Sequence, residues 1–168
     1  MLTATLLHAD GRYEDAFRAA RESVEIGDPM GLGADAKLAF VIAIDSAFQL
    51  HNLDEAEETI SLIQALPAGV QPPFLRAHAA RFGARLSAVR GAHEGVEQGF
   101  KTGEQIFREY GIPFWLAVTQ LEHAEWLAQQ GREGEAESLL VEAREIFERL
   151  EAKPWLERVA KLGAEVPA

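Results

Sequence analysis

Residues 11–29, GRYEDAFRAARESVEIGDP, decide the fold because their main features return along the chain at a fixed interval of 40 residues. Three columns keep this spacing. They are Gly11, His51, Gly91 and Gly131; Ala16, Ala56, Val96 and Ala136; and Ile26, Leu66, Ile106 and Ile146. A sustained period of this length without insertions is typical of a solenoid of stacked helical units. The spacing therefore predicts a fold that builds surfaces for binding.

Each repeat reads as a helix, a short turn and a second helix. Apolar or small residues recur at helical spacing, and Gly and Pro clusters such as Gly111-Ile112-Pro113 separate the repeats. The first helices are expected at 34–50, 74–90 and 114–130, with a shorter one within 1–10. The second helices are expected at 13–26, 53–66, 92–110 and 133–150. Gly at the anchor suits a turn that needs a left-handed backbone, and His51 departs from this rule.

A final helix is expected at 154–163, where Pro154 suits a helix start and an apolar stripe follows. In this interpretation Glu157, Arg158 and Lys161 face away from the core. The predicted fold is an all-α, right-handed α-solenoid in a single domain over 1–168. Its repeats cover about 1–29, 30–69, 70–110 and 111–151, and the final helix caps the last of them. The short first helix suggests a fragment of a larger protein.

The composition narrows the function. The chain has 168 residues, with 27 acidic against 16 basic side chains and a net charge of −11. This balance disfavours nucleic acid, which is bound mainly through Lys and Arg, and it disfavours anionic membranes. Cysteine is absent, so disulfides and thiol chemistry are excluded. With no long apolar run and no basic leader, the sequence favours a cytoplasmic protein away from membranes.

The segment 11–29 resembles the second half of a tetratricopeptide repeat, with Gly11, Tyr13, Ala16 and Pro29 at matching places. The period of 40 exceeds the usual ~34 residues. The C-terminal half contains a further internal repeat, because Ile106, Phe107 and Trp115 recur 40 residues later as Ile146, Phe147 and Trp155. It resembles the C-terminal repeats of bacterial ATPase-linked class III adenylate or guanylate cyclases and of large LuxR-type transcriptional regulators.

That resemblance implies a regulatory or partner-sensing role without chemistry in this chain. The leading hypothesis is a non-catalytic scaffold for protein interaction or intramolecular signal coupling. Its partner would be a protein, a peptide or another domain of the same parent chain. The alternative is an effector domain that senses a small ligand in the same groove. No catalytic, cofactor or metal motif is present, so no catalytic residue, cofactor site or metal site is predicted.

One column points to a binding face. Asp45, Arg85 and Glu125 lie six residues before the anchor, in a column that faces the concave groove in tetratricopeptide folds. Arg81 adds a second cation one turn before Arg85. Two hypotheses stay open for this column: an internal ladder of ion pairs, or a groove site for an anion or acidic peptide. The expected groove residues are Asp45, Arg81, Arg85, Glu125, His78 and Gln49. Leu2, Leu6 and Leu7 at the N-terminal end suggest a homodimer contact.

Overall fold

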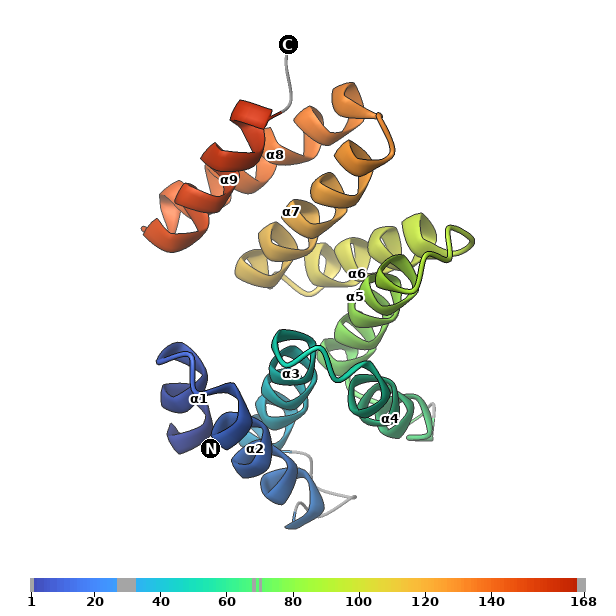
Figure 1. The fold of residues 1–168 in the computed structure, drawn as a ribbon, viewed down its shortest axis with the longest axis vertical. Coiled ribbons are helices and arrows are strands. Elements are labelled where there is room, and N and C mark those ends of the chain that lie inside the picture. The colour runs from blue at the N-terminus through green and yellow to red at the C-terminus, as the bar shows by residue number, and fades with distance from the viewer. Residues whose placement is uncertain (1, 27–32, 68, 70, 166–168) are drawn as a thin grey trace. The chain divides into compact units, whose positions relative to one another are not determined.

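The computed structural model describes residues 2–26, 33–67, 69 and 71–165, and these ranges form α-helices joined by turns, without a strand (Figure 1). The all-α class is therefore confirmed. The chain divides into two compact units, residues 1–86 and 87–168, where the repeat pattern predicts one continuous domain. Within the described ranges, no helix has both the length and the apolar character that a membrane crossing requires.

The first unit contains α1 (Leu2–Ala9), α2 (Tyr13–Ile26), α3 (Ala34–Gln49), α4 (Leu53–Gln64) and most of α5 (Pro73–Val89). Helix α2 packs against α1 and α3, and α3 also packs against α1 and α4. Ala4, Ala16, Ala20, Ile42 and Ala43 form a core shared by the first three helices. Phe48 of α3 stacks on Phe82 of α5, which joins these two helices.

The second unit contains α6 (Val96–Glu109), α7 (Pro113–Gln129), α8 (Glu133–Arg149) and α9 (Lys153–Glu165). Helix α7 is largely buried and packs against α6, α8 and α9. An aromatic cluster holds α9 in place, because Trp155 stacks on Phe147 of α8 and meets Phe114 of α7 edge-on. Helix α9 lies where a final helix is predicted, and it extends slightly beyond 154–163 at both ends.

The anchor positions share one turn geometry. Gly11, His51, Gly91 and Gly131 all have a positive φ, between 57° and 75°. At each of them the next residue donates its N–H to the carbonyl five residues back, at 2.9–3.0 Å. This is the Schellman motif, which satisfies the last carbonyls of a helix. The same motif recurs at Gly111 and Glu151, with φ of 64° and 53°.

The small-residue column is buried throughout. Ala16, Ala56, Val96 and Ala136 have no exposed surface, five residues after each anchor. In three of the repeats the next helix begins two residues after the anchor and packs on the helix before it, so Ala16, Ala56 and Ala136 take the same position in that contact, where a small side chain fits. In the third column Ile146 is buried and Leu66 and Ile106 are half-buried. The side chain of Ile26, the separator 27–29 and the repeat boundary near residue 29 lie outside the described residues.

Helix α6 starts later than predicted. The expected helix from Ala92 is wrong at its beginning, because residues 91–95 are not helical and the helix starts at Val96. Gly95 is the N-cap residue in a left-handed conformation, with φ of 79°. A left-handed residue cannot continue an α-helix, so the chain changes direction there.

The turn geometry predicts that His51→Gly stabilises the protein. An L-residue in the left-handed region is strained by about 1–2 kcal/mol, and glycine relieves that strain at a smaller cost in chain entropy. We expect about 1 kcal/mol of added stability and a melting temperature some 3 °C higher, measured by circular dichroism. Gly91→Ala is the matched control and should cost about 1 kcal/mol, because no atom lies within 4 Å of the added Cβ and backbone strain acts alone. A lower melting temperature for His51→Gly would contradict this account.

Candidate functional site

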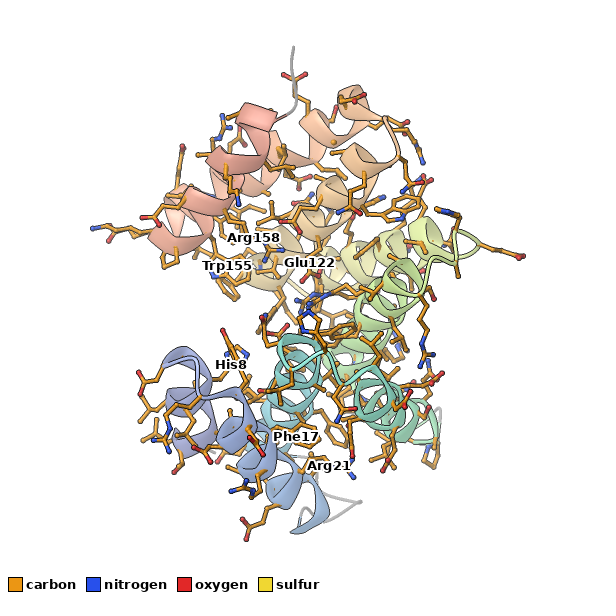
Figure 2. All side chains as sticks on the ribbon, in the orientation of Figure 1. His8, Phe17, Arg21, Glu122, Trp155 and Arg158 are labelled. Carbon is orange, nitrogen blue, oxygen red and sulfur yellow. The ribbon has the colours of Figure 1, made fainter. Side chains whose placement is uncertain are left out.

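Asp45 and Arg85 form the contact that the 40-residue column predicts. Arg85 Nη1 donates to Asp45 Oδ1 at 2.8 Å, and this ion pair joins α3 to α5. His8, which Figure 2 labels on α1, lies with its Nε2 2.9 Å from Asp45 Oδ2. One carboxylate therefore links three helices of the first unit. Because each side chain is about one fifth exposed, the cluster is only partly open to solvent.

The surroundings strengthen this cluster. The Arg85 guanidinium lies 4.3 Å from the centre of the Phe48 ring, in cation–π geometry. Burial alone would raise the pKa of Asp45, but the hydrogen bond from His8 and the charges of Arg85 and Arg81 hold that pKa well below its ordinary value of 3.8. Asp45 therefore stays ionised at any physiological pH.

Arg81 and His78 are not surface groups, in contrast to the expectation that they line an open groove. Arg81 is 2% exposed and His78 is fully buried. Arg81 Nη1 lies 3.3 Å from His78 Nδ1, and its guanidinium lies 4.5 Å from the centre of the Phe82 ring. A guanidinium only donates, so His78 Nδ1 is the acceptor and its ring is neutral. Gln49, the remaining predicted residue of the first unit, is exposed at the end of α3.

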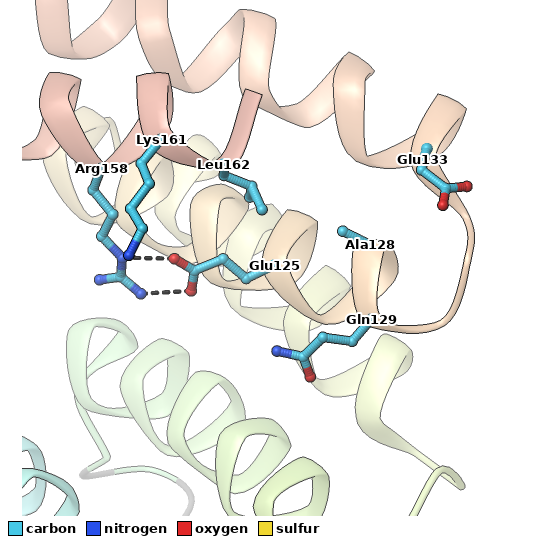
Figure 3. A pocket seen from close by; sticks show the side chains of 7 residues that line it. All are labelled: Glu125, Ala128, Gln129, Glu133, Arg158, Lys161 and Leu162. Atoms are coloured by element: carbon cyan, nitrogen blue, oxygen red, sulfur yellow. Dashed lines mark hydrogen bonds and ion pairs between the residues drawn. The ribbon is translucent and has the colours of Figure 1, made fainter. Parts of the chain in front are cut away.

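Glu125 has a different partner from the one its column suggests. Arg158 of α9 holds it in a bidentate ion pair, with Nε to Oε1 at 2.6 Å and Nη2 to Oε2 at 2.5 Å (Figure 3). The expectation that Arg158 faces away from the repeats is therefore wrong. A helical-wheel projection holds the signal that could have found it, since Arg158 lies only about 40° from Leu162 of the apolar stripe.

This ion pair forms one wall of a cleft of about 610 Å³ in the second unit, which we call the α7–α9 cleft. Its lining residues are Glu125, Ala128 and Gln129 of α7, Glu133 of α8, and Arg158, Lys161 and Leu162 of α9 (Figure 3). The volume falls in the range of ligand pockets, about 300–1,000 Å³. Charged, amide and apolar side chains meet there, so the cleft can recognise a ligand by charge and by shape.

A second polar pair in this unit is enclosed. His123 Nδ1 lies 2.7 Å from Glu104 Oε1, and both side chains are less than a tenth exposed. The imidazole stacks on Phe100, with ring centres 5.2 Å apart. Sequence reasoning missed Glu104, which lies on another helix 19 residues away. Because the pair is nearly buried and joins α7 to α6, it helps to orient these two helices.

No cluster of three or more His, Cys, Asp or Glu side chains in the described ranges is arranged to hold a metal ion. In comparisons with known proteins, no family model matches the chain and no curated protein matches it.

Loss of the Arg85 side chain should destabilise the first unit. Arg85→Ala removes the ion pair and leaves Asp45 partly buried without its guanidinium, so we expect a cost of about 2 kcal/mol, between the values for exposed and buried pairs. Arg76→Ala, on the exposed face of the same helix, is the matched control and should cost less than about 0.5 kcal/mol. Urea denaturation measures both. Equal midpoints for the two variants would show that the Asp45 cluster contributes nothing to stability.

Burial of His78 predicts a stability loss in mild acid. Burial, followed by the charge of Arg81, lowers the pKa of His78 well below its ordinary value of 6.5. Below pH 6.5 the unfolded chain binds a proton that the folded chain does not, so stability falls as the pH drops. We expect the wild type to lose about 1 kcal/mol more than His78→Gln between pH 7.5 and 5.5, in urea denaturation at each pH. Asp45 titrates below this window. Parallel losses in the two proteins would contradict the assignment.

Proposed function

We propose that this chain is a non-catalytic scaffold for protein interaction or intramolecular signal coupling, built from tetratricopeptide-like repeats of about 40 residues. By the resemblance of its C-terminal half, it is the regulatory repeat region of a multidomain bacterial signalling protein. The output domain of that protein would be a nucleotide cyclase with its ATPase module, or a transcriptional regulator.

The observation that carries the proposal is the recurrence of one helix-ending turn along the sequence. The left-handed turns at Gly11, His51, Gly91 and Gly131 share their hydrogen bonds, and each is followed five residues later by a buried small residue. Repeats of this kind present helix faces to partners and carry little chemistry of their own. The cytoplasm is the compartment that this role and the absence of cysteine favour.

The state of the predicted groove residues favours a binding surface in the second unit. In the first unit the predicted groove cations are engaged, with Arg81 buried and Arg85 held by Asp45. In the second unit the α7–α9 cleft is open and lined by side chains of three helices. We therefore assign the partner contact to this cleft. A homodimer through α1 is a second proposal, favoured by Leu2 and Leu6, which are 75% and 56% exposed.

One observation favours the alternative, a domain that senses a small ligand. The α7–α9 cleft has a volume that a metabolite-sized molecule would fill, and its polar groups come from different helices. The scaffold and the sensing domain can be distinguished by what remains bound to the purified chain. A sensing domain binds a defined small molecule at a fixed stoichiometry.

Affinity capture tests the scaffold function. The tagged chain is immobilised and incubated with lysate of the source cells, and captured proteins are eluted with an excess of the untagged chain. We expect at least one protein to elute competitively and, after separate purification, to bind with a saturable 1:1 titration in calorimetry. The reverse charge variant Lys161→Glu and the distant variant Lys153→Glu are compared in the same titration.

Native mass spectrometry of the chain purified from its source cells provides the opposing outcome. A small molecule retained at one per chain, together with the absence of any competitively eluted protein, would contradict the scaffold function and support the sensing domain. A captured protein without a retained small molecule would support the scaffold.

A further inference from the structure

We propose that the α7–α9 cleft binds an extended segment of a protein partner that places an acidic side chain at Lys161 and a basic side chain at Glu133. This inference rests on the proposed scaffold function, and it adds the chemistry of the partner.

Four charged residues line the cleft. Two of them form an ion pair with each other, and the other two, which we call the open charges, form no ion pair within the described residues. Glu125 and Arg158 satisfy each other through two hydrogen bonds and form a neutral wall. Within the described residues, Lys161 and Glu133 have no opposite charge within 4 Å. Both line the cleft, and Lys161 is exposed while Glu133 is half-buried. A ligand gains most binding free energy by placing opposite charges at Lys161 and Glu133, because Glu125 and Arg158 already use their charges and hydrogen bonds on each other.

The two open charges stand apart. Lys161 extends from α9 beside the Glu125–Arg158 pair, whereas Glu133 lies at the first residue of α8, with Ala128 and Gln129 between them (Figure 3). A single small ion can meet only one of these charges. A segment that runs along the cleft can meet both, with its backbone near the Gln129 amide and an apolar side chain near Ala128 and Leu162.

Charge also selects against other ligands. Because Arg158 neutralises Glu125, Glu133 is the carboxylate of the cleft that repels a polyphosphate or a nucleic acid, while Lys161 attracts it. A peptide that carries one acid and one base is neutral overall and avoids this repulsion. The arrangement therefore favours a mixed-charge peptide over a polyanion.

A peptide titration monitored by backbone NMR tests the proposal with the full chain. The probes are acetylated, amidated peptides with one Glu and one Lys separated by two to five Leu and Ala residues. Matched peptides carry Gln in place of the acid, the base or both. We expect at least one mixed-charge spacing to shift the amide signals of residues 125–133 and 158–162, with an affinity about fivefold above its Gln analogues. The absence of shifts there at millimolar peptide would overturn the proposal.

Variants show whether the named charges are responsible. Lys161→Glu should weaken the mixed-charge peptide by at least about tenfold, since it brings two like charges together. Lys153→Glu makes the same change in net charge on an exposed residue of α9 outside the cleft, and it should change affinity less than twofold. In Lys161→Ala, replacing the acid of the peptide by Gln should have no further effect, and in Glu133→Gln the same should hold for its base. Both variants must retain the wild-type spectrum away from the cleft.

Two outcomes separate this inference from the scaffold function. If a captured partner binds the wild type and Lys161→Glu equally, the cleft assignment is wrong while the scaffold function stands. If the peptides bind as expected but no protein is captured, the cleft chemistry is supported and the scaffold function is not.

Discussion

The left-handed residue that ends the helices is the constraint on which the rest of the structure depends. A helix leaves its last carbonyls without partners, and the Schellman motif satisfies them only if one residue takes a positive φ. Gly11, Gly91 and Gly131 do this without strain, and His51 does it with strain. Since the motif fixes the direction in which the next helix leaves, it also fixes which residue of that helix meets the previous one. Where the next helix begins two residues after the anchor, the buried Ala16, Ala56 and Ala136 follow from that geometry.

Ion pairs join helices of each unit to one another. Asp45 ties α1, α3 and α5 together through His8 and Arg85, and Glu125 ties α7 to α9 through Arg158. These two carboxylates share a sequence column, but their environments differ. Asp45 is partly buried between His8 and Arg85, and the Arg85 guanidinium lies over the Phe48 ring, whereas Glu125 lines an open cleft. The same register therefore gives a stabilising cluster in one unit and one wall of a candidate binding site in the other.

Much of the fold could be predicted from the sequence, because it depends on local rules. The spacing predicted the turns, the small-residue column and the contact between Asp45 and Arg85. The helix expected from Ala92 was wrong because Gly95 takes a left-handed conformation, which the apolar pattern does not reveal. The burial of Arg81 and His78 could not be read from α5 alone, since it depends on neighbouring helices. Arg158 was assigned to the wrong face because it lies at the edge of the apolar stripe, where a long side chain can reach either way.

The candidate site could be predicted only in part, because some of its features follow from local sequence and others depend on tertiary packing. A column shows which residues share a face, but only the packed helices show which of them keep an open charge. The 40-residue period corresponds to the repeat of one helix-ending turn, in which the anchor residue has a positive φ. Backbone NMR of the assigned chain tests it most directly, through the φ angles derived from chemical shifts at Gly11, His51, Gly91 and Gly131. The account predicts a positive φ at all four, including His51. A negative φ at His51, with helix continuing from residue 49 to 53, would contradict it.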